Sequence, residues 1–277
     1  MKILVIFLLT KEDKLLVLVN PKFVRLISEV NLQKEKLCSL IVERESLIFH
    51  ICKSLKVDYM LKIGILEYDL MKVQDDILRN KSYLELFEQN EQRYENDKEN
   101  LIREIKEKVD SEFLEFEKIE KKQLEDIDIA IDLSVSDILE KDELEELNHY
   151  YYNLQLFLNP ALKLTTREED DELYEKIKRL YKKGDIRKLK KISENYVKEP
   201  IIDEVENLEK LSNRFDILID ENQKLIDKIK TSFPYNQKNM LEEETFLRRK
   251  KECLNSQIYE LSKENEIVKA DLNKYMS

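Results

Sequence analysis

The stretch IGILEYDLMKVQDDILRNKSYLELF, residues 63–87, decides the fold class of this chain. Its apolar residues recur at alternating steps of three and four, with Asn80 as the one polar member of the series. The apolar members are Ile63, Leu66, Leu70, Val73, Ile77, Leu84 and Phe87. This heptad pattern predicts an α-helix whose apolar seam packs against another helix. We expect that partner to be the preceding helix, from about Ser28 to Lys53, folded back across residues 53–56.

A second seam of the same kind lies near the end of the chain. Its apolar members, again interrupted by a single asparagine, Asn222, are Leu208, Leu211, Phe215, Leu218, Leu225 and Ile229. Pro234 follows in the stretch 232–236 and cannot continue a helix. Apolar residues then recur every seven positions from Leu247 to Tyr275. Two heptad helices around a proline-containing turn predict an antiparallel coiled-coil hairpin.

The composition agrees with a helical chain. Among 277 residues there are only 2 glycines, 4 prolines and no tryptophan, and 39% of the residues are charged. Sheet proteins need glycine at turns with positive φ, so this composition disfavours most sheet architectures. A third helix is expected from residue 100 to about 124, and residues 127–135 fit either a strand or a helix, with the helix favoured. We therefore predict an elongated, all-α protein with antiparallel coiled-coil arms.

Net charge and cysteine content limit the partners and the compartment. The net charge of −11 argues against general nucleic-acid binding, because a polyanion would be repelled by most of the surface. The three cysteines are Cys38, Cys52 and Cys253. The first two would lie about 21 Å apart along one helix, too far to form a disulfide. An odd number of unpaired cysteines is typical of a reducing, cytoplasmic setting.

The N-terminal segment, residues 1–27, stays open. Its apolar run Ile3–Leu9 is followed by charged residues and is shorter than the roughly 20 apolar residues that a membrane span needs. A secretory signal would need a longer apolar core and a small-residue cleavage site. The interpretations that remain are a docked strand or helix turn, a hairpin with Leu15–Val19, a weak membrane or signal element, and an extension outside the domain.

No catalytic, cofactor or metal site is expected from the sequence. His50 and Cys52 are two positions apart on a helix and point about 200° apart, so they cannot hold one metal ion. The aspartates at 126, 128 and 132 have spacing similar to a calcium loop, but the loop glycine and terminal glutamate are missing. Gly64 and Gly184 are too far apart to form a phosphate-binding loop. We therefore expect a protein that is not an enzyme.

The middle of the chain, residues 126–197, is predicted to form a series of shorter helices. Asp142 and Glu145 are expected to cap a helix that ends at Asn159-Pro160, and Thr166 and Glu169 to cap the next one. That helix is predicted to end with Gly184 just beyond it, and a short helix follows from Asp185. A basic run, which is either a solvated helix surface or a partner-binding patch, comprises Lys178, Arg179, Lys182, Lys183, Arg187, Lys188, Lys190 and Lys191.

This middle segment resembles a J-domain, the module of DnaJ-type co-chaperones, and it is similar in particular to bacterial J-domain proteins embedded in coiled coils. The residues that carry the resemblance are Tyr151, Leu154, residues 158–162, the acidic stretch 168–171, residues 172–174 and residues 180–185. Outside the module, residues 58–68 and 232–235 also look like this class. The resemblance implies a helical module that contacts a DnaK-type ATPase through an exposed loop.

The module departs from the family at the residues that matter most. The family's loop is His-Pro-Asp, whereas this chain has Asn159, Pro160 and Ala161. The basic residues of the preceding helix are replaced by Tyr152, Asn153 and Leu156. The resemblance therefore implies a degenerate module that keeps its shape and has lost stimulation of the chaperone.

These observations predict four segments and one function. The segments are an apolar N-terminal segment (1–27), coiled-coil helices (28–125), a degenerate J-like helical module (126–197) and an antiparallel coiled-coil hairpin (198–277). The expected function is that of a helical scaffold or adaptor with a helical protein partner, no nucleic acid and no membrane span. The alternative is a divergent co-chaperone that engages a DnaK-type ATPase through the basic run. Whether the arms pair within one chain or between two copies stays open.

Overall fold

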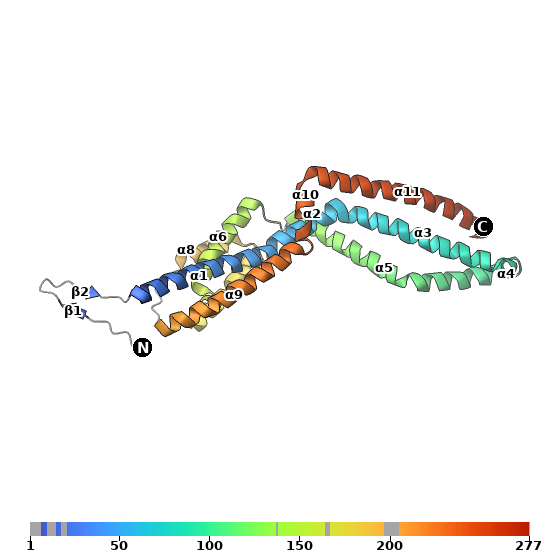
Figure 1. Ribbon diagram of the computed structural model, residues 1–277. Coiled ribbons are helices and arrows are strands. Elements are labelled where there is room, and N and C mark those ends of the chain that lie inside the picture. Colours follow the sequence, from blue (N-terminus) through green and yellow to red (C-terminus); the bar gives the residue numbers. More distant parts are fainter. Residues whose placement is uncertain are drawn as a thin grey trace. The chain divides into compact units, whose positions relative to one another are not determined.

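The computed structural model describes residues 7–9, 15–17, 21–136, 138–163, 167–196 and 205–276. The chain is an all-α protein, as the sequence predicts (Figure 1). Two three-residue strands, β1 (Phe7–Leu9) and β2 (Leu15–Val17), pair antiparallel. The other N-terminal residues on which the alternatives for this segment depend lie outside the described part. No helix in the described part is long and apolar enough to cross a bilayer.

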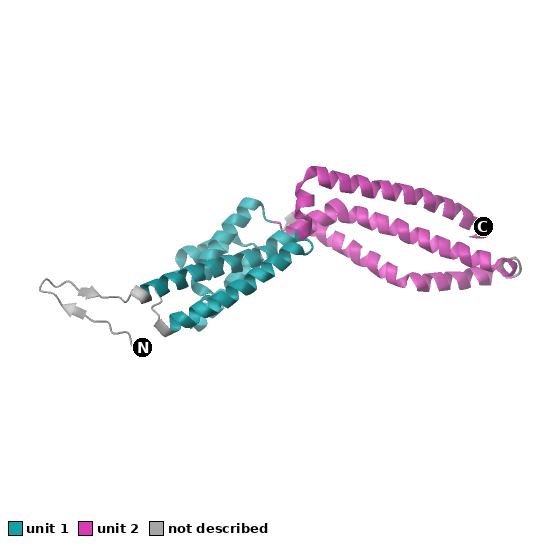
Figure 2. Cartoon of the chain, in the orientation of Figure 1, with its two compact units in different colours: residues 1–53, 139–235 teal, residues 54–138, 236–277 magenta. Residues whose placement is uncertain are grey.

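The helices form two compact units, each built from segments that are distant in the sequence (Figure 2). Unit 1 contains residues 1–53 and 139–235, and unit 2 contains residues 54–138 and 236–277. The four segments expected from the sequence are consecutive stretches, so their boundaries do not follow these units. The units are described one at a time below.

One helical run passes from unit 1 into unit 2 without a turn. It consists of α1 (Pro21–Ser46), η1 (Leu47–Ile51), α2 (Cys52–Tyr59), η2 (Met60–Gly64) and α3 (Ile65–Gln89), where η1 and η2 are short π-helical segments. The predicted fold-back across residues 53–56 is therefore wrong. That stretch holds no proline or glycine to end a helix, and Gly64 itself has helical backbone angles (φ −56°, ψ −36°).

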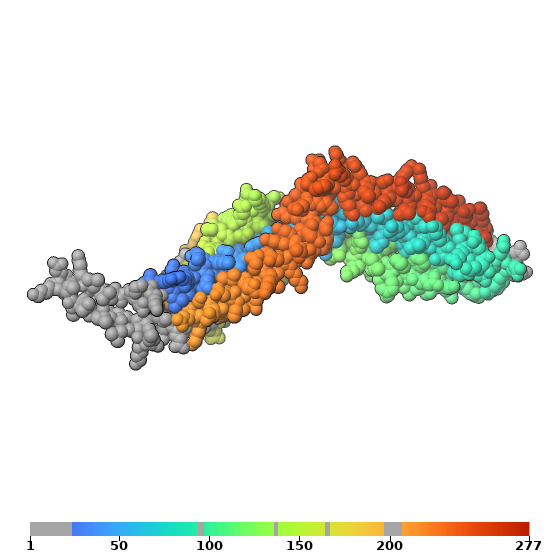
Figure 3. All heavy atoms as spheres, in the orientation of Figure 1, coloured from blue at the N-terminus to red at the C-terminus, as the bar shows by residue number. Residues whose placement is uncertain are grey.

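Unit 1 combines a pair of long helices with the shorter helices of the middle segment. These are α6 (Lys141–Leu158), the 3₁₀ turn η3 (Pro160–Leu162), α7 (Glu168–Lys182), α8 (Ile186–Asn195) and α9 (Val205–Thr231). In the space-filling view α9 lies along α1 (Figure 3). α6 packs against α1, α7 and α8. The cap of α6 is a reciprocal one between Glu140 and Glu143, two residues before the expected pair.

In unit 2, α3 lies between α5 (Lys98–Ser136) and α11 (Glu244–Met276) (Figure 1). The shorter elements are α4 (Glu91–Asn96), η4 (Tyr235–Gln237, at the unit boundary) and α10 (Lys238–Glu242). Residues 127–135 belong to α5, which confirms the helical alternative for them. The main core cluster of this unit comprises Phe87, Leu101, Ile105, Val109, Phe113 and Leu272.

Both heptad seams are buried or partly buried except at Leu225, which is 46% exposed while its neighbour Ile226 is fully buried. The helices that pack on the seams also differ from those expected. α9 packs against α1 within unit 1, and α11 packs against α3 within unit 2, so each helix of the predicted C-terminal hairpin has a partner outside that hairpin. The asparagine of each seam forms a hydrogen bond with a polar side chain of the helix that packs against it. Asn222 accepts a hydrogen bond from Arg44 on α1 (2.7 Å), and Asn80 donates to Asn265 on α11 (2.9 Å).

Candidate protein-binding surface

Hydrogen bonds within the protein hold the loop after α6. Asn159 is only 3% exposed, and its Oδ1 accepts a hydrogen bond from the backbone N–H of Ala161 (2.8 Å). Its Nδ2 donates to Oε1 of Gln155 (2.7 Å). Asn159 therefore ends α6 and begins η3. Asn159 occupies the position where the J-domain family has its histidine, and both polar atoms of its side chain are engaged in hydrogen bonds within this loop and α6.

Helix α9 holds the same loop from its other side. The Arg214 guanidinium donates to the carbonyl oxygens of Lys163 (3.2 Å) and Pro160 (3.4 Å). The Lys163 ammonium is itself buried and pairs with Asp170 near the start of α7 (3.0 Å). The loop is thus tied to α7 and α9 by charged groups, which make stronger hydrogen bonds than neutral ones.

The face of α6 that carries Tyr152 and Leu156 is packed against the core of unit 1. Cys38 on α1 is fully buried, and its Sγ donates to the backbone oxygen of Tyr152 (3.7 Å). Burial raises the pKa of Cys38 to about 12, so the thiol stays protonated and can act as this donor. Asn153, next to them, contacts His149 Nε2 (3.2 Å). The part of α6 for which the resemblance implies an exposed docking face is therefore mainly an internal packing surface.

Behind this face lies a buried polar group that sequence reasoning did not find. Tyr151 is fully buried and donates to Oε2 of Glu45 on α1 (2.6 Å). Burial, followed by the nearby negative charge of Glu45, raises the pKa of Tyr151, so the phenol stays protonated. The ring of Tyr151 stacks on that of Tyr181 at 3.8 Å between centroids. A glutamate on the apolar face of α1 was the available signal, but nothing in the sequence joins it to Tyr151.

His50 lies next to these residues, against Tyr181. Its ring meets the edge of Tyr181 at 5.0 Å between centroids, and its Nε2 is buried without a hydrogen-bond partner. Burial lowers the pKa of His50. Within the described residues no group of three His, Cys, Asp or Glu side chains could hold a metal ion. Asp126, one member of the calcium-like spacing, instead pairs with Lys56 (2.7 Å).

The turn between α7 and α8 forms as the sequence predicts. Gly184 has φ +71° just beyond the end of α7. Its N–H donates to Tyr181 (2.9 Å), and the N–H of Asp185 donates to Leu180 (3.0 Å), which is the Schellman arrangement. The Asp185 side chain then caps α8 by accepting from the N–H of Lys188 (3.1 Å). Thr166, the expected cap of α7, lies outside the described residues.

The basic run is placed on the second half of α7 and on α8, and three of its eight cations form ion pairs. Lys178 pairs with Glu175, Lys188 with Asp185 and Lys190 with Glu146, while the Lys182 ammonium lies 5.5 Å from the Phe49 ring centroid. The cations of the run that form no ion pair with any described residue are Arg179, Lys182, Lys183, Arg187 and Lys191.

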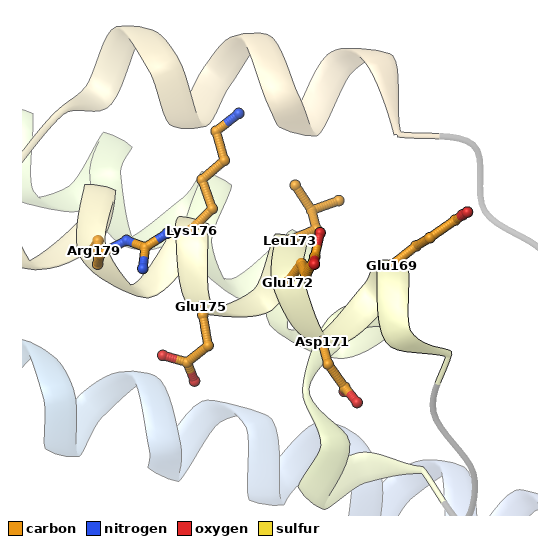
Figure 4. Close-up of a pocket in the computed structure, with 7 residues that line it drawn as sticks. All are labelled: Glu169, Asp171, Glu172, Leu173, Glu175, Lys176 and Arg179. Carbon is orange, nitrogen blue, oxygen red and sulfur yellow. The ribbon is translucent and has the colours of Figure 1, made fainter.

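Two adjoining hollows flank α7. One is a groove of about 520 Å³ between α7 and α8, lined by Leu173, Lys176, Lys188, Lys191, Ile192, Asn195 and Tyr196. The other, of about 690 Å³, lies along α7 and is lined by Glu169, Asp171, Glu172, Leu173, Glu175, Lys176 and Arg179 (Figure 4). Figure 4 shows Leu173 and Lys176, which the two hollows share, pointing to one side of α7, and Asp171 and Glu175 pointing to the other. Lys176 therefore lies on the opposite side of α7 from Asp171 and Glu175.

Comparison with known proteins gives no relative. No protein-family model, no curated protein and no solved structure matches this chain.

Proposed function

We propose that the chain is a cytoplasmic, non-enzymatic helical scaffold or adaptor that acts through protein–protein contacts. In this proposal residues 126–197 contain a J-like module that no longer stimulates a DnaK-type ATPase. The coiled-coil pairs α1–α9 and α3–α11 supply the rigid framework, and α7 and α8 present the partner-binding side chains.

The observation that carries the proposal is the position of Asn159. A trigger loop must present its side chains to a partner, but Asn159 is buried and both polar atoms of its side chain are engaged internally. A histidine placed there would replace a carboxamide that satisfies a backbone N–H. The loss of such a cap costs about 1 kcal/mol, so the loop is built for stability.

The packing of α6 supports the same conclusion. A chaperone that docks on α6 needs an accessible basic face to steer its acidic surface into place. Here Tyr152 and Leu156 are packed on the unit 1 core, and the one lysine of α6, Lys141, lies at its start. The basic residues lie instead on α7 and α8, on helices that follow the loop.

The test is a single-turnover ATPase assay with a DnaK-type chaperone from the same host. A co-chaperone with an intact His-Pro-Asp loop serves as the positive control. The unaltered chain should leave the hydrolysis rate unchanged even at high concentration. The double change Asn159→His plus Ala161→Asp should also fail to stimulate and should unfold at a lower denaturant concentration, because the buried cap is lost.

Clear stimulation by the unaltered chain would refute the proposal and favour the divergent co-chaperone. In that case the basic run becomes the docking surface to test. Replacing Arg187 and Lys191 with glutamate should then abolish the stimulation, since both cations are exposed and unpaired.

A further inference from the structure

The groove between α7 and α8 combines an apolar floor with a basic rim. Its floor consists of Leu173 on α7 together with Ile192 and Tyr196 at the end of α8, all partly exposed. Lys176 stands on the α7 side, and Lys188 and Lys191 stand on the α8 side. All three lysines are exposed, and Lys188 is engaged by Asp185. Lys176 on α7 and Lys191 on α8 therefore line the groove without an ionic partner among the described residues.

The charge around this groove is opposite to that of the chain as a whole. Between residues 176 and 193 there are nine lysine or arginine residues and one acidic residue, Asp185, although the net charge of the chain is −11. Such local asymmetry creates a field that attracts an acidic partner and speeds its association. This attraction weakens at high salt, where the field of the lysines is screened.

We propose that this groove binds an acidic amphipathic segment of a partner protein. The inference rests on the proposed adaptor function and names the chemistry of its partner. One or two apolar side chains of the segment enter the floor at Leu173, Ile192 and Tyr196. Carboxylates on either side of them pair with Lys176 on one helix and Lys191 on the other.

Two features favour a protein segment over a nucleic acid. The floor offers apolar area, which a phosphate backbone does not use. The neighbouring hollow along α7 carries four carboxylates, which would repel a strand that extended past the groove; they are Glu169, Asp171, Glu172 and Glu175. A short acidic segment reaches that hollow only at Leu173 and Lys176, which the two hollows share, and unlike a nucleic acid it gains apolar contacts with the floor.

The probe for the test is a fluorescent peptide of about 15 residues, near the length at which an isolated helix becomes marginally stable. It has leucine at every third or fourth position and glutamate elsewhere, and the comparison peptide replaces each glutamate with glutamine. Binding to the full chain is measured by fluorescence anisotropy at about 0.15 M salt, where the Debye length is about 8 Å. A single-stranded RNA of matched net charge is the third probe.

The decisive variant is Lys176→Glu plus Lys191→Glu, and the matched control is Lys183→Glu plus Arg187→Glu. Both pairs combine one change on the α7 side with one on α8, change the net charge equally and alter exposed residues, but only the first pair lines the groove. We expect the first pair to weaken binding of the acidic peptide at least about tenfold and the control about threefold or less. Leu173→Ser should weaken binding to a similar degree as the first pair.

The outcomes separate the possibilities. Three results would each refute peptide binding in the groove. They are an equal loss of affinity in the two charge-pair variants, binding of the glutamine peptide as tight as that of the acidic peptide, and tighter binding of the RNA. If the glutamate pair changes the far-UV circular dichroism, Lys176→Gln plus Lys191→Gln takes its place with the same expected order. The same samples enter the ATPase assay above. Stimulation there refutes the adaptor function, whereas no stimulation and no peptide binding leaves that function standing and refutes the groove.

Discussion

The Asn80–Asn265 pair allows a quantitative test of how unit 2 is held in register. Asn80 Nδ2 donates to Asn265 Oδ1 at 2.9 Å, and Asn265 is only 6% exposed. The change Asn80→Leu leaves the Asn265 carboxamide buried without this partner. An unsatisfied buried polar group costs about 1–3 kcal/mol, and the added leucine offsets this only in part because position 80 is half-buried. We expect a lower free energy of unfolding for this variant and for Asn265→Leu.

The double variant Asn80→Leu plus Asn265→Leu removes both polar groups and should be at least as stable as the unaltered chain. Its stability should exceed the sum of the two single effects by about 1–3 kcal/mol, measured by urea unfolding followed by circular dichroism. Light scattering should also show additional oligomeric states, since a buried asparagine restricts the register and partner number of a heptad seam. Strictly additive single effects would show that the two side chains do not stabilise each other.

Three further predictions concern unit 1. Gly184→Ala should reduce the free energy of unfolding by about 1–2 kcal/mol, because φ is +71° and the new Cβ would lie 3.3 Å from Leu139. Gly64→Ala should cost less in the same urea titration, because its backbone is helical and the atom 2.9 Å from the new Cβ belongs to the flexible Met60 side chain. Equal losses would contradict the argument. Tyr151→Phe should cost about 1.5–3 kcal/mol because Glu45 loses its donor, whereas the exposed Tyr259→Phe should change stability by less than about 0.5 kcal/mol. Burial lowers the pKa of His50 below its usual 6.5, so the unfolded chain binds more protons than the folded chain just below pH 6.5. The melting temperature should therefore fall as the pH drops through 6.5, and His50→Gln should reduce this fall. An unchanged dependence of the melting temperature on pH in the variant would show that His50 does not contribute.

The heptad pattern predicted the helices well and their partners poorly. A seam of apolar residues specifies which face of a helix is buried, and the seams of α3 and α9 lie at helix contacts as expected, except that Ile226 is buried in place of Leu225. It does not specify which other seam covers it, because apolar side chains pack against each other without direction. The pairing depends on single polar contacts such as Arg44–Asn222, which join residues 178 positions apart.

The same limit explains the missed continuity of the long helix. The turn expected at residues 53–56 rested on the need to cover the seam of α3, although that stretch contains no helix-breaking residue. The local signal was the better guide, and the seam is covered by α5 and α11 instead. Where a breaker is present the prediction succeeded, as at Gly184, whose positive φ and following Asp185 cap are determined by the local sequence.

The burial of α6 bears on where a partner can bind. A partner that used the face of α6 now covered by α1 would first have to separate two helices that share one core, to which Leu37, Cys38 and Ile41 of α1 belong. Exposing a large apolar side chain costs about 1.5–3 kcal/mol, so exposing Leu37 and Ile41 alone would cost about 3–6 kcal/mol. That is a large part of the binding free energy of a micromolar complex, about 8 kcal/mol. The exposed side chains of α7 and α8 impose no such cost, and a partner of ordinary affinity should therefore bind there while α1 stays on α6.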